Sequence, residues 1–169
     1  MEKRIVCSVL GGLLLLLAVL LGYAWLHPAK GVLVLEYHHI AAEPGEDEAS
    51  AIRYFVPPED FREQLDYLKA EGYETITMLD FSKAAKGKGK LPPKPLIITF
   101  DDGYEDNYST ALPLLEERGM KAEVYMVTNF IGLKGYLTWE QLRDMQQRGI
   151  EIGCHTCDHL PLVGLSRAE

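Results

Sequence analysis

The chain has 169 residues, 47% of them hydrophobic and 25% charged, a balance that is typical of a globular domain and excludes collagen-like or largely disordered proteins. Its formal net charge of −8 comes without a stripe of Lys and Arg, which argues against nucleic-acid binding because phosphates are met by a basic surface. The 3 cysteines are too few for a disulfide scaffold.

The N-terminus has the pattern of a membrane-targeting segment. Lys3 and Arg4 precede an uncharged, largely apolar stretch over residues 5–26, which is long enough for a helix to cross a bilayer. We expect residues 1–4 in the cytoplasm, a linker at 27–31 and everything beyond it outside, since basic flanks stay inside. The length of the apolar run favours an uncleaved signal anchor, with one pass through the cell membrane. A signal peptide cleaved near Gly22-Tyr23-Ala24, which would release a secreted protein, is the alternative.

Residues 32–169 alternate between segments of strand and helix character. Strands are predicted at 32–35, 75–78, 96–100, 123–127 and 151–153, and helices at 58–71, 80–85, 110–118 and 139–148. The apolar run at 32–35 is typical of a strand buried on both faces. Thr138 and Gln141 form a capping-box pair before the last helix. This alternation predicts an α/β fold with a parallel sheet or barrel.

Polar side chains follow three of these strands. His38 and His39 come after the first, Asp101 and Asp102 after the third, and His155 after the last. Ligand sites in parallel α/β folds form at the carboxyl ends of the strands, so we expect these groups to meet. We place His38 and His39 at the rim of such a site, where hydrogen-bonded packing explains them equally well.

The aspartates and histidines together suggest a metal site. Two adjacent carboxylates repel each other unless a cation neutralises one, although Asp101-Asp102-Gly103 could also be a simple turn. The spacing of His155 and His159 would place both imidazoles on one face of a helical turn. One carboxylate with two histidines is a typical hydrolytic metal site, and the second aspartate is then free to act as general base.

Two cysteines flank the first of these histidines. Cys154 and Cys157 form a CxxC pair, which could be a thiol–disulfide redox site or could contribute thiolate ligands to a structural zinc. A c-type haem site is excluded because Asp158 follows the second cysteine. The simplest interpretation is that both are small residues beside the metal ligands.

Two segments of this sequence resemble motifs of a known family. Thr99-Phe100-Asp101-Asp102-Gly103 and His155-Thr156-Cys157-Asp158-His159 look like the first two motifs of the polysaccharide deacetylases, the NodB-homology domain of carbohydrate esterase family 4. Residues 34–40 also resemble the opening strand of exported poly-N-acetylglucosamine deacetylases. The resemblance covers residues 31–165. It implies a distorted (β/α) barrel and a divalent metal, commonly zinc, that serves to remove acetyl groups from N-acetylated sugars or, in some members, from O-acetylated xylan.

The resemblance also implies a role for each matching residue. Asp101 matches the general base of the family, and Asp102, His155 and His159 match its metal ligands. Cys154 stands where the family commonly has serine, a small change that need not disturb the ligands.

Three later motifs of the family have no match in these residues. They are an arginine–proline segment, an aspartate–tryptophan segment, and the leucine–x–histidine that supplies the general acid. We therefore expect residues 32–169 to be the N-terminal part of a (β/α) barrel, catalytically incomplete as given. Because a half-open barrel would expose apolar sheet edges, we also expect this chain to fold poorly by itself.

The resulting hypothesis is a membrane-anchored, extracytoplasmic, metal-dependent deacetylase of a cell-wall or matrix polysaccharide. A non-catalytic glycan- or metal-binding remnant of such an enzyme is the second hypothesis, and a thiol redox protein is the third. The pattern does not distinguish poly-N-acetylglucosamine, peptidoglycan, chitin-like oligomers and acetyl-xylan as substrates. It favours zinc only through the resemblance, since sites of Asp and His accept several divalent ions.

Overall fold

The computed structural model describes residue 17, residues 31–42 and residues 53–164. The chain divides into two units, Met1–Gly31 and Val32–Glu169, and the architecture below is that of the second. The membrane-spanning segment expected at 5–26 lies outside the described residues, except for residue 17. Within the described part, no helix combines the length and apolar character that a bilayer crossing requires.

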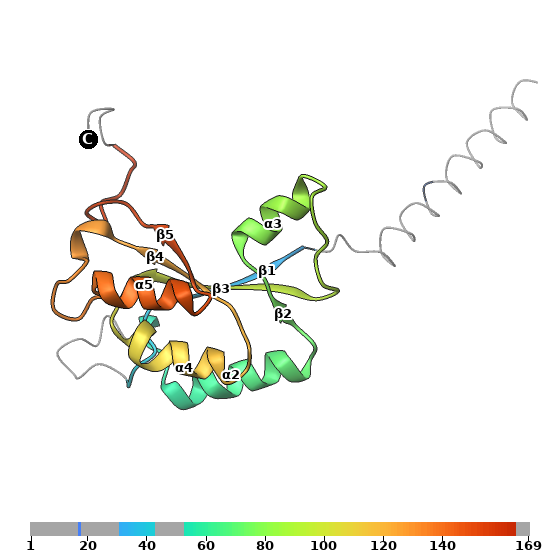
Figure 1. Cartoon of the computed structure of the whole chain (residues 1–169), viewed down its shortest axis with the longest axis horizontal. Coiled ribbons are helices and arrows are strands. Elements are labelled where there is room, and N and C mark those ends of the chain that lie inside the picture. The colour runs from blue at the N-terminus through green and yellow to red at the C-terminus, as the bar shows by residue number, and fades with distance from the viewer. Residues whose placement is uncertain (1–16, 18–30, 43–52, 165–169) are drawn as a thin grey trace, which may run out of the picture. The chain divides into compact units, whose positions relative to one another are not determined.

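A parallel sheet of five strands forms the centre of this unit (Figure 1). The strands are β1 (Leu33–Tyr37), β2 (Glu74–Thr75), β3 (Pro95–Asp102), β4 (Glu123–Met126) and β5 (Glu151–Cys154). Their order is β1-β3-β4-β5, and the short β2 pairs with the beginning of β3. The predicted α/β class with a parallel sheet is confirmed.

Helices connect the strands. They are α2 (Pro58–Ala70), α3 (Met78–Ala85), α4 (Leu112–Glu116), which continues a π-helical turn η2 (Asn107–Ala111), and α5 (Trp139–Gln147), with a 3-10 turn η3 at Thr128–Phe130. Figure 1 shows α2, α4 and α5 on one side of the sheet and α3 on the other. Apolar side chains of β3 and β4 form the main core with the three helices on their side of the sheet.

The helix α2 shows why this core forms where it does. Phe61, Leu65 and Leu68 recur at helical spacing and are buried, so one face of α2 packs against the sheet. Pro58 starts the helix, where its missing N–H costs nothing. The chain leaves the helix at Gly72 with a φ of +76°, as the sequence predicts.

Three of the predicted elements differ in detail. The strand expected at 75–78 ends at Thr75, because Thr77 and Asp80 form a capping box that starts α3 at Met78. The helix expected at 110–118 begins earlier, through the π-helical turn at Asn107. The strand β1 is not buried on both faces: Leu33 and Val34 are 41% and 50% exposed, because β1 is an edge strand of the described sheet.

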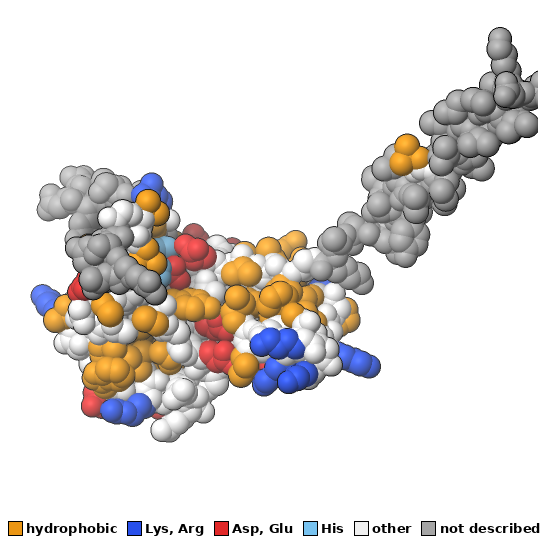
Figure 2. All heavy atoms as spheres, turned by 90° about the horizontal axis from the view of Figure 1, so that it is seen from above, with side chains coloured by type: hydrophobic (Ala, Val, Ile, Leu, Met, Phe, Trp, Pro, Cys, Tyr) orange, Lys and Arg blue, Asp and Glu red, His pale blue; other side chains and the backbone are white. Residues whose placement is uncertain are grey.

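The face of the sheet opposite α2, α4 and α5 carries acidic side chains. Glu36, Thr99, Glu123 and Glu151 stand in one register row across four strands, and Asp101 lies two residues further along β3 on the same face. Figure 2 shows Asp and Glu side chains gathered on this face beside histidine. Glu123 is 3% exposed, and its carboxylate accepts hydrogen bonds from the Met78 N–H and from the Tyr125 hydroxyl. This buried acid therefore ties the start of α3 to β4.

Candidate functional site

Strand β3 delivers two adjacent carboxylates to its carboxyl end. Asp101 continues the strand geometry, whereas Asp102 has a backbone φ of +69°. Residues other than glycine, Asn and Asp rarely adopt this conformation. The Asp102 side chain is only 7% exposed. Its Oδ1 atom is buried and has no hydrogen-bond partner among the described residues. A buried carboxylate oxygen without a donor is costly, so this atom calls for a positively charged partner.

The segment after β5 brings two histidines to that oxygen. The Nε2 atom of His159 lies 3.2 Å from Asp102 Oδ1, and the Nε2 atom of His155 lies 3.6 Å from it. The two imidazole rings are 5.1 Å apart. The three residues predicted as metal ligands therefore converge on one point from two strands that are not neighbours.

The backbone between these histidines is not the helical turn that their spacing suggested. It is an irregular loop in which Thr156 and His159 have φ values of +67° and +56°. Two backbone hydrogen bonds dock the loop on η3, from Thr128 N–H to the Thr156 carbonyl and from Asn129 N–H to the Cys157 carbonyl. The prediction of the helical turn was wrong, although the two residues meet as expected.

The donor set suits a divalent cation. One carboxylate oxygen and two imidazole nitrogens lie within 4.8 Å of one another, and these are the ligand types that zinc and related ions accept. The buried, unpartnered Oδ1 of Asp102 has the negative charge and the free lone pairs for such a contact. Asp102, His155 and His159 thus fit the metal that the sequence motifs imply.

Asp101 lies beside this group, and its side chain is more exposed than that of Asp102. Its Oδ2 atom is 4.0 Å from His155 Nε2. Burial raises the pKa of the Asp101 carboxyl, the nearby His155 lowers it, and the Glu36 carboxylate raises it further. A carboxylate with a raised pKa is a better proton acceptor, as a general base requires.

The two histidines after β1 have different surroundings. His38 lies at the site, where one ligand atom each of Glu36, His38 and Asp101 come within 4.8 Å of one another. His39 does not line the site: its Nδ1 donates to the Asp106 carboxylate over 2.6 Å, and its ring lies between Phe55 and Tyr104. Of the two interpretations from the sequence, the position at the rim of the site describes His38, and hydrogen-bonded packing describes His39.

Sequence reasoning missed three residues near the site: Glu36, Tyr104 and Asp106. The Tyr104 hydroxyl is close enough to Asp102 that its pKa is raised, mainly by burial and then by that carboxylate. The alternation along β1 could have indicated Glu36, because it occupies the same strand face as His38.

The two cysteines beside His155 are free and exposed. Neither belongs to the groups of potential metal ligands found in the described part of the chain. A Cys/His zinc site thus gains no support, and the redox interpretation stays a prediction.

Comparisons with known proteins give the family to which this sequence is similar. Residues 88–169 match the family model described as polysaccharide deacetylase. YxkH of Bacillus subtilis (strain 168), named as a polysaccharide deacetylase, is 40% identical over 146 residues, covering 85% of this chain and 49% of that protein. A poly-β-1,6-N-acetyl-D-glucosamine N-deacetylase of Staphylococcus epidermidis is 31% identical over 143 residues, and the match covers 76% of this chain and 49% of that enzyme.

A solved structure has a similar fold. The deacetylase PplD of Streptococcus pyogenes, in complex with acetate, superimposes with a TM-score of 0.69 at 28% identity. The match covers 80% of this chain and 59% of the PplD chain. The present chain spans about half the length of the two curated relatives.

Proposed function

Because the chain belongs to the polysaccharide deacetylase family, we propose that it is a metal-dependent hydrolase that removes N-acetyl groups from a cell-wall or matrix polysaccharide. The observation that carries this proposal is the buried, unpartnered Asp102 Oδ1 facing His155 and His159, with Asp101 beside them. A relative named for action on poly-β-1,6-N-acetyl-D-glucosamine supports a substrate of that class.

Each residue of the site has a role in the proposed reaction. Asp102, His155 and His159 would hold a divalent cation. We favour zinc through the family resemblance, since carboxylate and imidazole ligands accept several divalent ions. The cation supplies Lewis acidity toward the acetamide carbonyl. Asp101 orients the attacking water and accepts its proton on a carboxylate oxygen as the new C–O bond forms. Asp101 then gives this proton to the amide nitrogen as the C–N bond breaks, which releases acetate and leaves a free amine on the sugar.

The burial of Asp101 favours this role. Burial raises the pKa of its carboxyl, so the carboxylate holds an abstracted proton more readily than a solvated aspartate would. The neighbouring His155 lowers the pKa of this carboxyl and so opposes part of the effect of burial.

We further propose that residues 5–26 anchor the protein in the membrane and that the domain acts outside the cytoplasm. The support is the sequence alone: a basic pair at Lys3 and Arg4 followed by an uncharged apolar run. A polysaccharide of the cell wall or matrix would be accessible from that side.

Acetate release from a β-1,6-linked N-acetylglucosamine oligomer tests the function. Any acetate that the purified full chain releases should require zinc and should stop when the metal is chelated. We expect the rate to be low, because these residues have no match to the motif that supplies the general acid in the family. Asp101→Asn should bind zinc as the wild type does but lose at least about 100-fold in rate, as expected for a missing general base. Asp102→Asn should lose both zinc and activity.

The two isosteric variants are matched controls for each other, because each replaces one carboxylate oxygen by an NH₂ group at the end of β3. Zinc binding without acetate release would support the second hypothesis, a non-catalytic metal-binding protein. Zinc binding that survives Asp102→Asn would contradict the proposed site.

A further inference from the structure

The turn that carries the Asp102 ligand is strained. Asp102 and Gly103 have consecutive positive φ values of +69° and +80°. Glycine adopts this conformation freely, but a residue with a Cβ atom does so only when its surroundings hold it there. The direction of the Asp102 carboxylate depends on this conformation, so the groups that hold the turn also aim the ligand at His155 and His159.

A column of aromatic rings lies directly against the turn. Tyr104 follows Gly103, and its ring stacks on His39 with centroids 3.6 Å apart and on Tyr136 with centroids 5.1 Å apart. Phe55 covers the other face of His39 at 4.1 Å. We call these four rings, Phe55, His39, Tyr104 and Tyr136, the aromatic clamp. They come from three separate connections of the chain, which meet beside the site.

Backbone hydrogen bonds join the clamp to the turn itself. The Leu137 N–H donates to the Gly103 carbonyl over 3.0 Å, and the Glu105 N–H donates to the Gly135 carbonyl over 2.9 Å. The turn after Asp102 is thus paired with the segment that carries Tyr136. Tyr104 cannot move without changing both contacts.

Asp106 holds the His39 end of the clamp. Its Oδ2 atom accepts from His39 Nδ1 at 2.6 Å, and its Oδ1 atom accepts from the Ile40 N–H at 2.9 Å. The Asn107 amide donates to the His38 carbonyl at 2.8 Å. Three hydrogen bonds therefore fix the segment after β1 against the segment after β3, which sets the position of the His39 ring under Tyr104.

From these contacts we propose that His39 and Tyr104 are positioning residues for the metal site. They hold the strained Asp102–Gly103 turn and so set the affinity and coordination geometry of the bound cation without touching it. The inference rests on the proposed metal site. It assigns a role to Tyr104 and to the second histidine of the His38-His39 pair. A merely structural role for the clamp predicts something different, a loss of stability with an unchanged metal site.

Cobalt binding to the full chain separates the two roles, since Co²⁺ accepts the same ligands as Zn²⁺ and its visible spectrum reports coordination geometry. His39→Leu and Tyr104→Leu should each weaken cobalt binding at least about tenfold and alter the visible bands. Tyr73→Leu is the matched control, because Tyr73 packs against the same core at a site unrelated to the clamp. It should lower the melting temperature of the cation-free protein but leave the cobalt affinity and spectrum as in the wild type.

His39→Phe adds a conservative variant that keeps the stack and loses the bond to Asp106. It should retain more cobalt affinity than His39→Leu, and it keeps the test open if the leucine variant does not fold. Wild-type affinity and spectrum in the folded clamp variants would overturn the positioning role while leaving the metal site intact. A wild-type chain that binds no cobalt would overturn the metal site, and the positioning role with it.

Discussion

Gly103 shows how little room there is beside the Asp102–Gly103 turn. A Cβ atom added there would lie 2.0 Å from the sulfur of Met126, which is itself buried, and the φ of +80° disfavours any other residue. We expect Gly103→Ala to lower the free energy of unfolding by about 2–4 kcal/mol, combining left-handed backbone strain with overpacking. Urea denaturation measures this difference directly.

Gly132→Ala is the matched control for that substitution. Gly132 has nearly the same φ, +82°, but an added Cβ would meet nothing within 4 Å. It should therefore cost only the backbone strain, about 1–2 kcal/mol. Equal losses for the two variants would contradict the close approach of Met126.

Some residues of the candidate site could be predicted from the sequence, and others could not. Asp101, Asp102, His155 and His159 were predictable because chemically distinctive residues stand at strand ends. Asp106 was not, because its partner His39 is 67 residues away and only the pairing of β1 with β3 brings them together. His155 and His159 lie together as their spacing suggested, but the segment that joins them is an irregular loop and not the expected helical turn.

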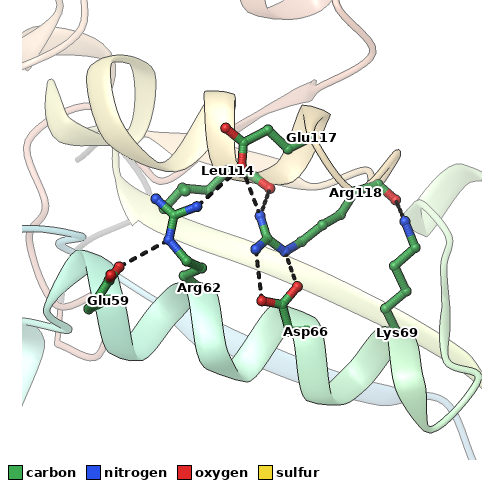
Figure 3. Close-up of polar contacts among 7 residues, drawn as sticks. All are labelled: Glu59, Arg62, Asp66, Lys69, Leu114, Glu117 and Arg118. Atoms are coloured by element: carbon green, nitrogen blue, oxygen red, sulfur yellow. Dashed lines mark hydrogen bonds and ion pairs between the residues drawn. The ribbon is translucent and has the colours of Figure 1, made fainter.

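At the scale of elements, α2 and α4 are joined by a charged network (Figure 3). Arg118, just after α4, donates to both oxygens of Asp66 on α2, over 2.7 and 2.9 Å, and Lys69 donates to the Arg118 carbonyl. The hydrogen bond from Arg118 lowers the pKa of the Asp66 carboxyl. A carboxyl with a lowered pKa stabilises the fold above its unfolded-state pKa, and this contribution disappears as pH falls through the folded value.

The lowered pKa of Asp66 predicts how the stability of the domain depends on pH. Asp66→Asn should be less stable than the wild type at pH 7, and the difference should become smaller at about pH 2, which lies below the usual carboxyl range. Chemical denaturation at both pH values measures it. Glu63→Gln on the same helix is the control, because no ion pair of Glu63 is found among the described residues. A difference that persists in acid would show that Asp66 acts through packing and not through its charge.

The start of α5 offers a second test at this scale. The Thr138 hydroxyl accepts from the Gln141 N–H, and the Gln141 side chain accepts from the Thr138 N–H. Thr138→Ala should lower the free energy of unfolding by about 1 kcal/mol, because one donor in the first turn loses its partner. Thr138→Ser, which keeps the hydroxyl, should restore most of that stability in the same denaturation experiment.

Capping signals also explain which element boundaries were predictable. Thr138 and Gln141 marked the start of α5 correctly in the sequence. The equivalent pair of Thr77 and Asp80 was overlooked, so a strand was predicted through residues that begin α3. The π-helical turn before α4 has no comparable local signal, because it depends on Asp106 and Asn107 bonding to the segment after β1.

At the scale of the whole domain, the parallel sheet is what assembles the site. The fold class followed from the alternation of strands and helices, and it alone placed the aspartates and histidines at one edge. The burial of β1 did not follow, because an apolar run does not say whether its strand has neighbours on both sides. Leu33 and Val34 on this edge strand are exposed. Exposed apolar edges are the reason for expecting that the chain folds poorly by itself, and that expectation stays a prediction.

The proposed metal site has a consequence for the stability of the whole domain. Asp102 belongs to β3, whereas His155 and His159 follow β5, the edge strand on the far side of β4. A cation bound by all three therefore links the centre of the sheet to its edge. Zinc at 100 times its dissociation constant should raise the free energy of unfolding by about 2.7 kcal/mol, since ligand binding to the folded state alone stabilises it. The melting temperature should rise by about 5–10 °C.

Hydrogen exchange locates this effect within the sheet. Zinc should slow exchange of the β5 amides more than that of the α2 amides, because the edge strand gains a tether that α2 does not. Asp101→Asn keeps the three ligands and should show the full shift in melting temperature, whereas Asp102→Asn should show none. A shift of wild-type size in Asp102→Asn would mean that zinc stabilises the domain from another place. Glu36 and His38 would then be the groups to replace next, since they stand with Asp101 within 4.8 Å of one another.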